Sequence, residues 1–63
     1  MRFNNNHAYQ YMENITATQA MKWAQVANQM YGKMEKLGGK PKECERRAID
    51  EASRVISKMG KVD

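Results

Sequence analysis

The segment Leu37-Gly38-Gly39-Lys40-Pro41 constrains this chain most, because one helical pattern ends there and another begins within a few residues. Glycine suits the left-handed conformation just past a helix C-terminus, and proline suits the first turn of a helix. So short a connection favours antiparallel packing of the flanking helices. We therefore predict an all-α chain, an antiparallel helical hairpin over residues 15–60, with helices at about 16–37 and 41–59 and a turn at 38–40.

Both flanking segments have the pattern of amphipathic helices. Thr16 and Gln19 form the T-x-x-Q pattern of a capping box at the start of the first helix. Apolar residues then recur at spacings of three and four, which places them on one face of each helix. The outer face of the second helix carries acid–base pairs at i,i+4, namely Glu43–Arg47 and Asp50–Arg54.

The two ends of the chain lack such a pattern. Residues 1–14 are rich in Asn and Gln and sustain no helical period. Asn side chains compete for backbone hydrogen bonds and so disfavour regular structure. We predict a flexible N-terminal arm, with docking of its end on the helices as the alternative. Residues 61–63 are expected to fray.

The small size of the chain points to oligomerisation. A domain of 63 residues buries only about 60% of the surface of its unfolded chain, and disulfides, a metal or a second copy usually supply the missing stability. Cys44 is the only cysteine, and with His7 it falls short of the roughly four ligands of a structural zinc site. Because the apolar stripe of the first helix is too broad for one facing helix, we predict a homodimer in which two hairpins form a four-helix bundle. The alternative is a monomeric hairpin with the N-terminal arm laid over the stripe.

The apolar residues of both helices are assigned to the core or the dimer interface. These residues are Trp23, Ala27, Met30, Tyr31, Met34, Leu37, Ile49, Ala52, Val55, Ile56 and Met59. Met12 and Met21 lie off the stripe. Methionine adapts to irregular surfaces, so these two are available to a partner.

The net charge of +4 permits a nucleic acid or an acidic protein as partner. The candidate nucleic-acid contacts are the basic residues of the second helix, Lys42, Arg46, Arg47, Arg54 and Lys58. Acidic residues are mixed with them, which favours a solvated face over a phosphate-binding stripe. Binding of DNA or RNA is therefore the alternative function.

No residue pattern indicates catalysis, a metal or a cofactor. Cys44 occupies an apolar position of the second helix, where a buried and unreactive thiol is typical, so a His7–Cys44 thiolate pair is not expected. We expect no enzyme and no cofactor. The single cysteine and the lack of an apolar run for a signal peptide or membrane span predict a cytoplasmic protein without membrane contact.

Three features carry a resemblance to a known family: the Asn-rich start, the segment Gln-Ala-Met-Lys-Trp-Ala at 19–24, and the segment Leu-Gly-Gly-Lys-Pro-Lys-Glu-Cys-Glu-Arg at 37–46. In these features the chain resembles the small early-region proteins of lambdoid bacteriophages. Those proteins are encoded between the recombination and excision genes. The resemblance covers about residues 15–60. It implies an accessory regulator of lytic versus lysogenic development that acts on host or phage factors in the host cytoplasm. Our first expectation is a non-enzymatic regulator that acts by protein–protein contact as a helical dimer.

Overall fold

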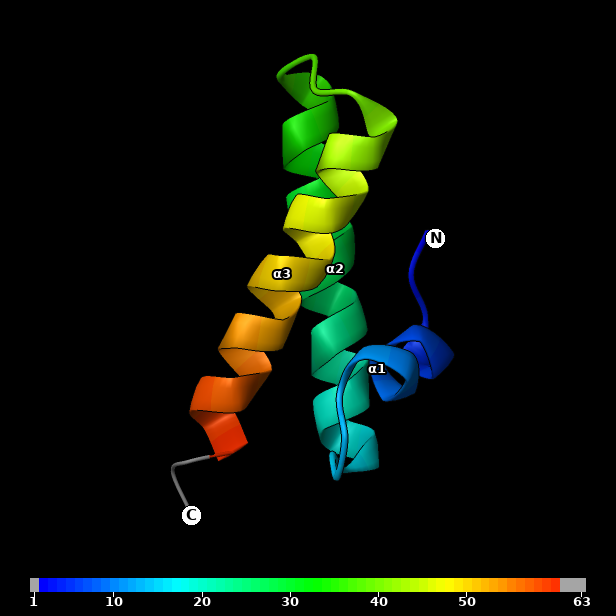
Figure 1. Ribbon diagram of the computed structural model, residues 1–63, viewed down its shortest axis with the longest axis vertical. Helices are drawn as coiled ribbons and strands as arrows, with labels where there is room; N and C mark the ends of the chain where they lie inside the picture. The colour runs from blue at the N-terminus through cyan, green and yellow to red at the C-terminus, as the bar shows by residue number, and fades with distance from the viewer. Residues whose placement is uncertain (1, 61–63) are drawn as a thin grey trace.

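The structure, a computed structural model, describes residues 2–60. It contains three helices, α1 (Asn5–Tyr11), α2 (Ala17–Lys36) and α3 (Pro41–Gly60), and no strand occurs among the described residues. The predicted all-helical class is confirmed. In Figure 1, α2 and α3 lie side by side and run in opposite directions, while the short α1 crosses the first half of α2. None of the helices in this part of the chain is long and apolar enough to cross a membrane.

The boundaries of α2 follow from its end residues. Thr16 Oγ1 accepts a hydrogen bond from the Gln19 amide at 3.1 Å, and Gln19 Oε1 accepts one from the Thr16 amide at 2.9 Å, which is the predicted capping box. At the other end, Gly38 has a φ of 84°. The Gly38 amide donates to the carbonyl of Glu35 and the Gly39 amide to that of Met34, both at 3.0 Å. These two bonds form a Schellman motif, which ends α2.

The turn brings α3 tightly against the end of α2. A Cβ on Gly39 would lie 3.0 Å from Cys44 Sγ and 3.1 Å from the Met34 carbonyl oxygen. A side chain at this position would crowd both atoms, so glycine permits the close approach of α3 to the end of α2. On the outer face of α3, Arg54 and Asp50 form an exposed ion pair at 3.7 Å, whereas the predicted Glu43–Arg47 pair is not formed within residues 2–60.

The prediction that residues 1–14 lack regular structure is wrong for α1. Asn4 Oδ1 accepts hydrogen bonds from the amides of Asn6 at 3.0 Å and His7 at 3.3 Å, and His7 Nδ1 accepts one from the Asn4 amide at 3.0 Å. Histidine thus takes the place of the usual Glu or Gln in a second capping box. Phe3 and Ala8 are both buried and occupy the positions of a hydrophobic staple. Residues 61–63, predicted to fray, lie outside the described residues.

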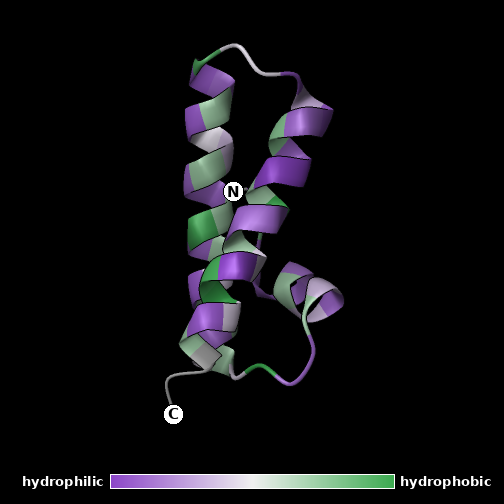
Figure 2. Cartoon of the chain, turned by 60° about the vertical axis from the view of Figure 1, so that its left-hand side comes forward, coloured by the Kyte–Doolittle hydropathy of each residue, from purple (hydrophilic) through white to green (hydrophobic). Residues whose placement is uncertain are grey.

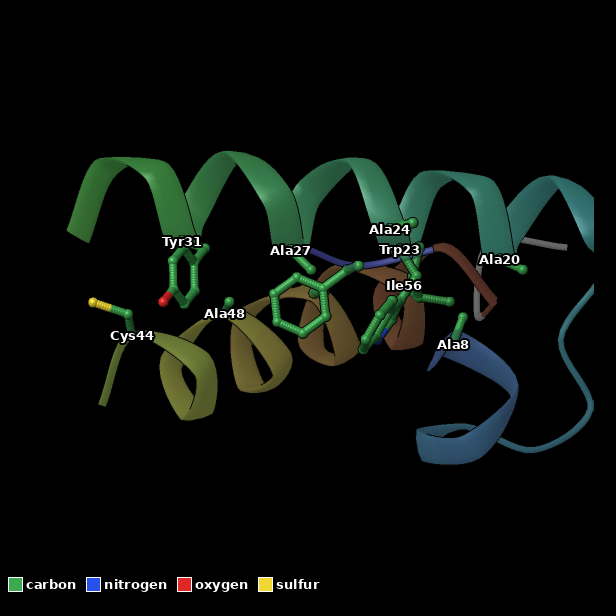
Figure 3. Close-up of a cluster of buried hydrophobic side chains, with 11 residues drawn as sticks. Ala8, Ala20, Trp23, Ala24, Ala27, Tyr31, Cys44, Ala48 and Ile56 are labelled. Carbon is green, nitrogen blue, oxygen red and sulfur yellow. The ribbon is translucent and has the colours of Figure 1, made fainter. Parts of the chain in front are cut away.

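The core lies between α2 and α3 and extends under α1 (Figure 3). Six of its members are alanines, which let the helices approach closely: Ala8, Ala20, Ala24, Ala27, Ala48 and Ala52. Trp23 is fully buried, and its Nε1–H donates to Ser53 Oγ on α3 at 3.1 Å. Hydrophobic and hydrophilic residues alternate along α2 and α3 in Figure 2, as expected for amphipathic helices.

The N-terminal segment covers the part of the α2 stripe that α3 leaves open. The Phe3 ring packs edge-on against Trp23 at 5.8 Å and Tyr31 at 6.2 Å between ring centroids. Tyr11 stacks on Trp23 at 5.9 Å, and the Arg2 guanidinium lies 4.3 Å from the centre of the Tyr31 ring. This arrangement corresponds to the alternative in which the arm lies over the stripe. The single chain thus covers much of the stripe that a second copy was expected to cover, and dimerisation stays a prediction.

Candidate interaction surface

The predicted interface residues fall into three groups. Trp23, Ala27, Tyr31, Ala52 and Ile56 are buried within the single chain. Met30, Met34, Ile49 and Val55 are half-buried at the edges of the core. Leu37 is 87% exposed, and Met59 is 38% exposed. Most of the apolar stripe therefore serves the internal core.

The candidate nucleic-acid residues all lie on the exposed side of α3. They are Lys42, Arg46, Arg47, Arg54 and Lys58. Lys42 and Arg46 line a hollow of about 560 Å³ with Tyr11, but Glu45 and Asp50 line it as well. The mixture of charges expected from the sequence is thus present in three dimensions.

The two residues considered for thiol chemistry are not brought together. His7 belongs to the cap of α1, where its ring binds the Asn4 amide. Cys44 is 1% exposed and lies at the opposite end of the core from Ala8 of α1 (Figure 3). Within residues 2–60, no three His, Cys, Asp or Glu side chains are grouped so that they could hold a metal ion.

A surface that the sequence did not reveal lies along the outer side of α2. We call it the α2 groove, a hollow of about 850 Å³ lined by Phe3, Asn4, Asn5, Thr18, Met21, Lys22, Ala24, Gln25, Asn28 and Gln29. Its most exposed apolar side chain is Met21, at 61%. The position of Met21 off the core stripe was the only sequence signal for it.

The wall of the α2 groove is held by a pair of hydrogen bonds. The Phe3 amide donates to Asn28 Oδ1 at 2.9 Å, and Asn28 Nδ2 donates to the Phe3 carbonyl at 3.0 Å. The Asn28 side chain thus bonds both backbone polar groups of Phe3 and holds the segment before α1 against α2. Because the Phe3 ring is also packed in the core, this wall exists before any partner binds.

The charge around the α2 groove is positive. Among residues 2–60, Lys22 is the only charged residue that lines it. An adjoining hollow of about 550 Å³ shares Asn28 and Gln29 with it and adds Lys33, Lys36 and Glu51. An uncharged floor with a mainly cationic edge is an arrangement that binds amphipathic, acidic surfaces.

Comparison with known proteins adds no relative: no family model, curated protein or solved structure matches this chain.

Proposed function

We propose that this chain is a non-enzymatic accessory protein that acts by binding another protein through the α2 groove. The observation that carries the proposal is the exposure of Met21 beside a wall that is already fixed by Phe3 and Asn28. An exposed methionine in a preformed hollow gains contact area on binding at little cost in ordering.

The dimensions of the α2 groove favour a segment of protein over a small molecule. Its volume of about 850 Å³ is near the upper end for ligand sites, but the hollow is open to solvent along α2 and does not enclose a ligand. Peptide segments of partner proteins commonly bind in open grooves of this kind. The resemblance to phage early-region proteins would make the partner a host or phage regulatory factor.

Site-specific cross-linking tests the proposal. A photo-reactive residue replaces Gln25, which is exposed and lines the α2 groove, in cells that express the protein. The matched control places the same group at the exposed Ser57 of α3, which does not line the α2 groove. We expect a discrete cross-linked protein from position 25 that is lost with Met21→Lys. Equal products from both positions, or none from position 25, would refute the proposal.

Nucleic-acid binding is supported by a separate observation. Tyr11 is 52% exposed and stacked on the buried Trp23, next to Lys42 and Arg46 in one hollow. A fixed aromatic ring beside cations is typical of single-strand binding. A gel shift with single-stranded RNA at about 50 mM salt tests it. Binding lost on joint replacement of Arg46, Arg47 and Arg54 by Ser would support this second function, and no shift at that salt would end it.

The helical-hairpin dimer is the further part of the proposal. The predicted interface residues that the single chain does not fully bury are Met30, Met34, Leu37, Ile49, Val55 and Met59. A four-helix bundle would cover them, since bundles bury the edges of facing helix pairs. Sedimentation equilibrium over a hundredfold dilution tests this part. A mass of one 7.3 kDa chain at every concentration would contradict it.

A further inference from the structure

We infer that the occupant of the α2 groove is an amphipathic helix of another protein whose flank carries acidic residues. This inference rests on the proposed function and names the chemistry of the partner. It starts from the floor, where Met21, Gln25 and Asn28 follow one another at spacings of four and three along one face of α2. That face spans two helical turns, or roughly 10 Å, which accommodates two or three side chains of a docked helix.

The backbone of α2 favours a helical occupant. An extended segment that binds by strand addition needs free backbone donors and acceptors along the surface that receives it. Residues 21–28 lie inside a 20-residue helix, so their amides and carbonyls are bonded within α2. A partner helix carries its own bonded backbone and needs only side-chain contacts. The side chains of Met21, Ala24 and Gln25, which all line the α2 groove, offer such contacts.

The positive edge sets the charge of the occupant. Lys22 lines the α2 groove, and Lys33 lies 11 residues further along the same edge of α2, about three helical turns away. Both side chains are exposed, and neither forms an ion pair within residues 2–60. Carboxylates on the flank of a docked helix would meet both ammonium groups. A second copy of this chain carries a net charge of +4, so its overall charge opposes docking at that edge.

Two labelled helical peptides test the inference by fluorescence anisotropy. Both carry Leu at i, i+3 and i+7 on an Ala-rich helix; one has Glu on its flanks and the other Lys. At about 50 mM salt we expect the full-length protein to bind the Glu peptide about tenfold more tightly than the Lys peptide, or ~1.4 kcal/mol. The variant with Lys22→Glu and Lys33→Glu should lose or reverse that preference. Met21→Gln should weaken binding of the Glu peptide and leave the preference in place.

The control variant carries Lys42→Glu and Arg46→Glu on α3, which changes the net charge by the same amount away from the α2 groove. It should keep the preference of the parent protein, and circular dichroism should show unchanged helicity for all variants. The inference would be overturned if the parent protein bound the two peptides equally. It would also be overturned if both double variants lost the preference for the Glu peptide to the same extent. If Gln25 still cross-links a protein while the Glu peptide does not bind, the proposed function stands and the acidic helix is wrong. If position 25 gives no cross-linked protein and the Glu peptide does not bind, the proposed function and the acidic helix are both wrong.

Discussion

Replacing Phe3 by Ala should destabilise the whole chain, although Phe3 stands near its N-terminus. Phe3 is 3% exposed, and its ring meets the rings of His7, Trp23 and Tyr31 edge-on at centroid distances of 5.7 to 6.2 Å. Burial of a phenylalanine side chain contributes about 1.5–3 kcal/mol, and each aromatic pair adds about 0.5–1.5 kcal/mol. Core Phe→Ala substitutions cost about 3–5 kcal/mol in general.

The cost at Phe3 has an upper limit set by its place in the chain. Once Phe3 is lost, the segment before α1 can detach while α2 and α3 stay packed, so the loss should not exceed the free energy that holds this segment in place. We therefore expect a loss of about 2–4 kcal/mol in the free energy of unfolding. For a chain of this size, each kcal/mol lowers Tm by about 4–8 °C.

Urea denaturation followed by circular dichroism measures this loss, and tryptophan fluorescence reports its cause. Trp23 is the only tryptophan and is fully buried, so exposure of its ring after Phe3→Ala should shift its emission to longer wavelength. The matched control is Tyr9→Ala on α1, because Tyr9 is 50% exposed. Its expected change is below about 0.5 kcal/mol. Equal urea midpoints for the two variants, with unchanged Trp23 emission, would refute the packing of Phe3 in the core.

Three further predictions follow from the turn, the core and the thiol. Gly38→Ala should lower the free energy of unfolding by about 1 kcal/mol, because φ is 84° at Gly38. Gly32→Ala should raise it by about 0.5–1 kcal/mol, because Gly32 lies inside α2 with open space around it. Urea midpoints of the two variants that move in the same direction would contradict this. Ser53→Ala leaves the buried Nε1–H of Trp23 without its acceptor and should cost about 1–3 kcal/mol by the same measurement, and a neutral effect would mean that the bond contributes nothing. Cys44, at 1% exposure, should react with a thiol reagent only as fast as the protein opens, so labelling at the rate of a free thiol peptide would disprove its burial.

Helices α2 and α3 were predictable because their signals are local. The Thr16–Gln19 box and the glycines before Pro41 specify ends that differ from the observed ones by a residue. The three-and-four spacing of apolar residues also identified the buried faces, including Trp23 and Ile56. Each of these features depends on residues close together in sequence, so a single chain is enough to read them.

Helix α1 was missed because its stabilising contacts are distant or unusual. Its buried face has one apolar residue, Ala8, so it shows no apolar period, and its box uses His7 where Glu or Gln is expected. The spacing of Phe3, Asn4 and Ala8 does match a staple around an N-cap, and a search for that pattern would have found the helix. The α2 groove was beyond prediction, since its wall depends on the Phe3–Asn28 bonds between residues 25 positions apart.

A two-dimensional NOE spectrum of the full chain measures most directly whether the N-terminal segment docks on α2, on which both the core and the α2 groove depend. Packing at the observed ring distances predicts strong cross-peaks from the Phe3 ring protons to those of Trp23 and Tyr31, and shifted Phe3 resonances. Phe3 resonances at the positions of an unfolded peptide, with no cross-peak to either ring, would contradict that packing.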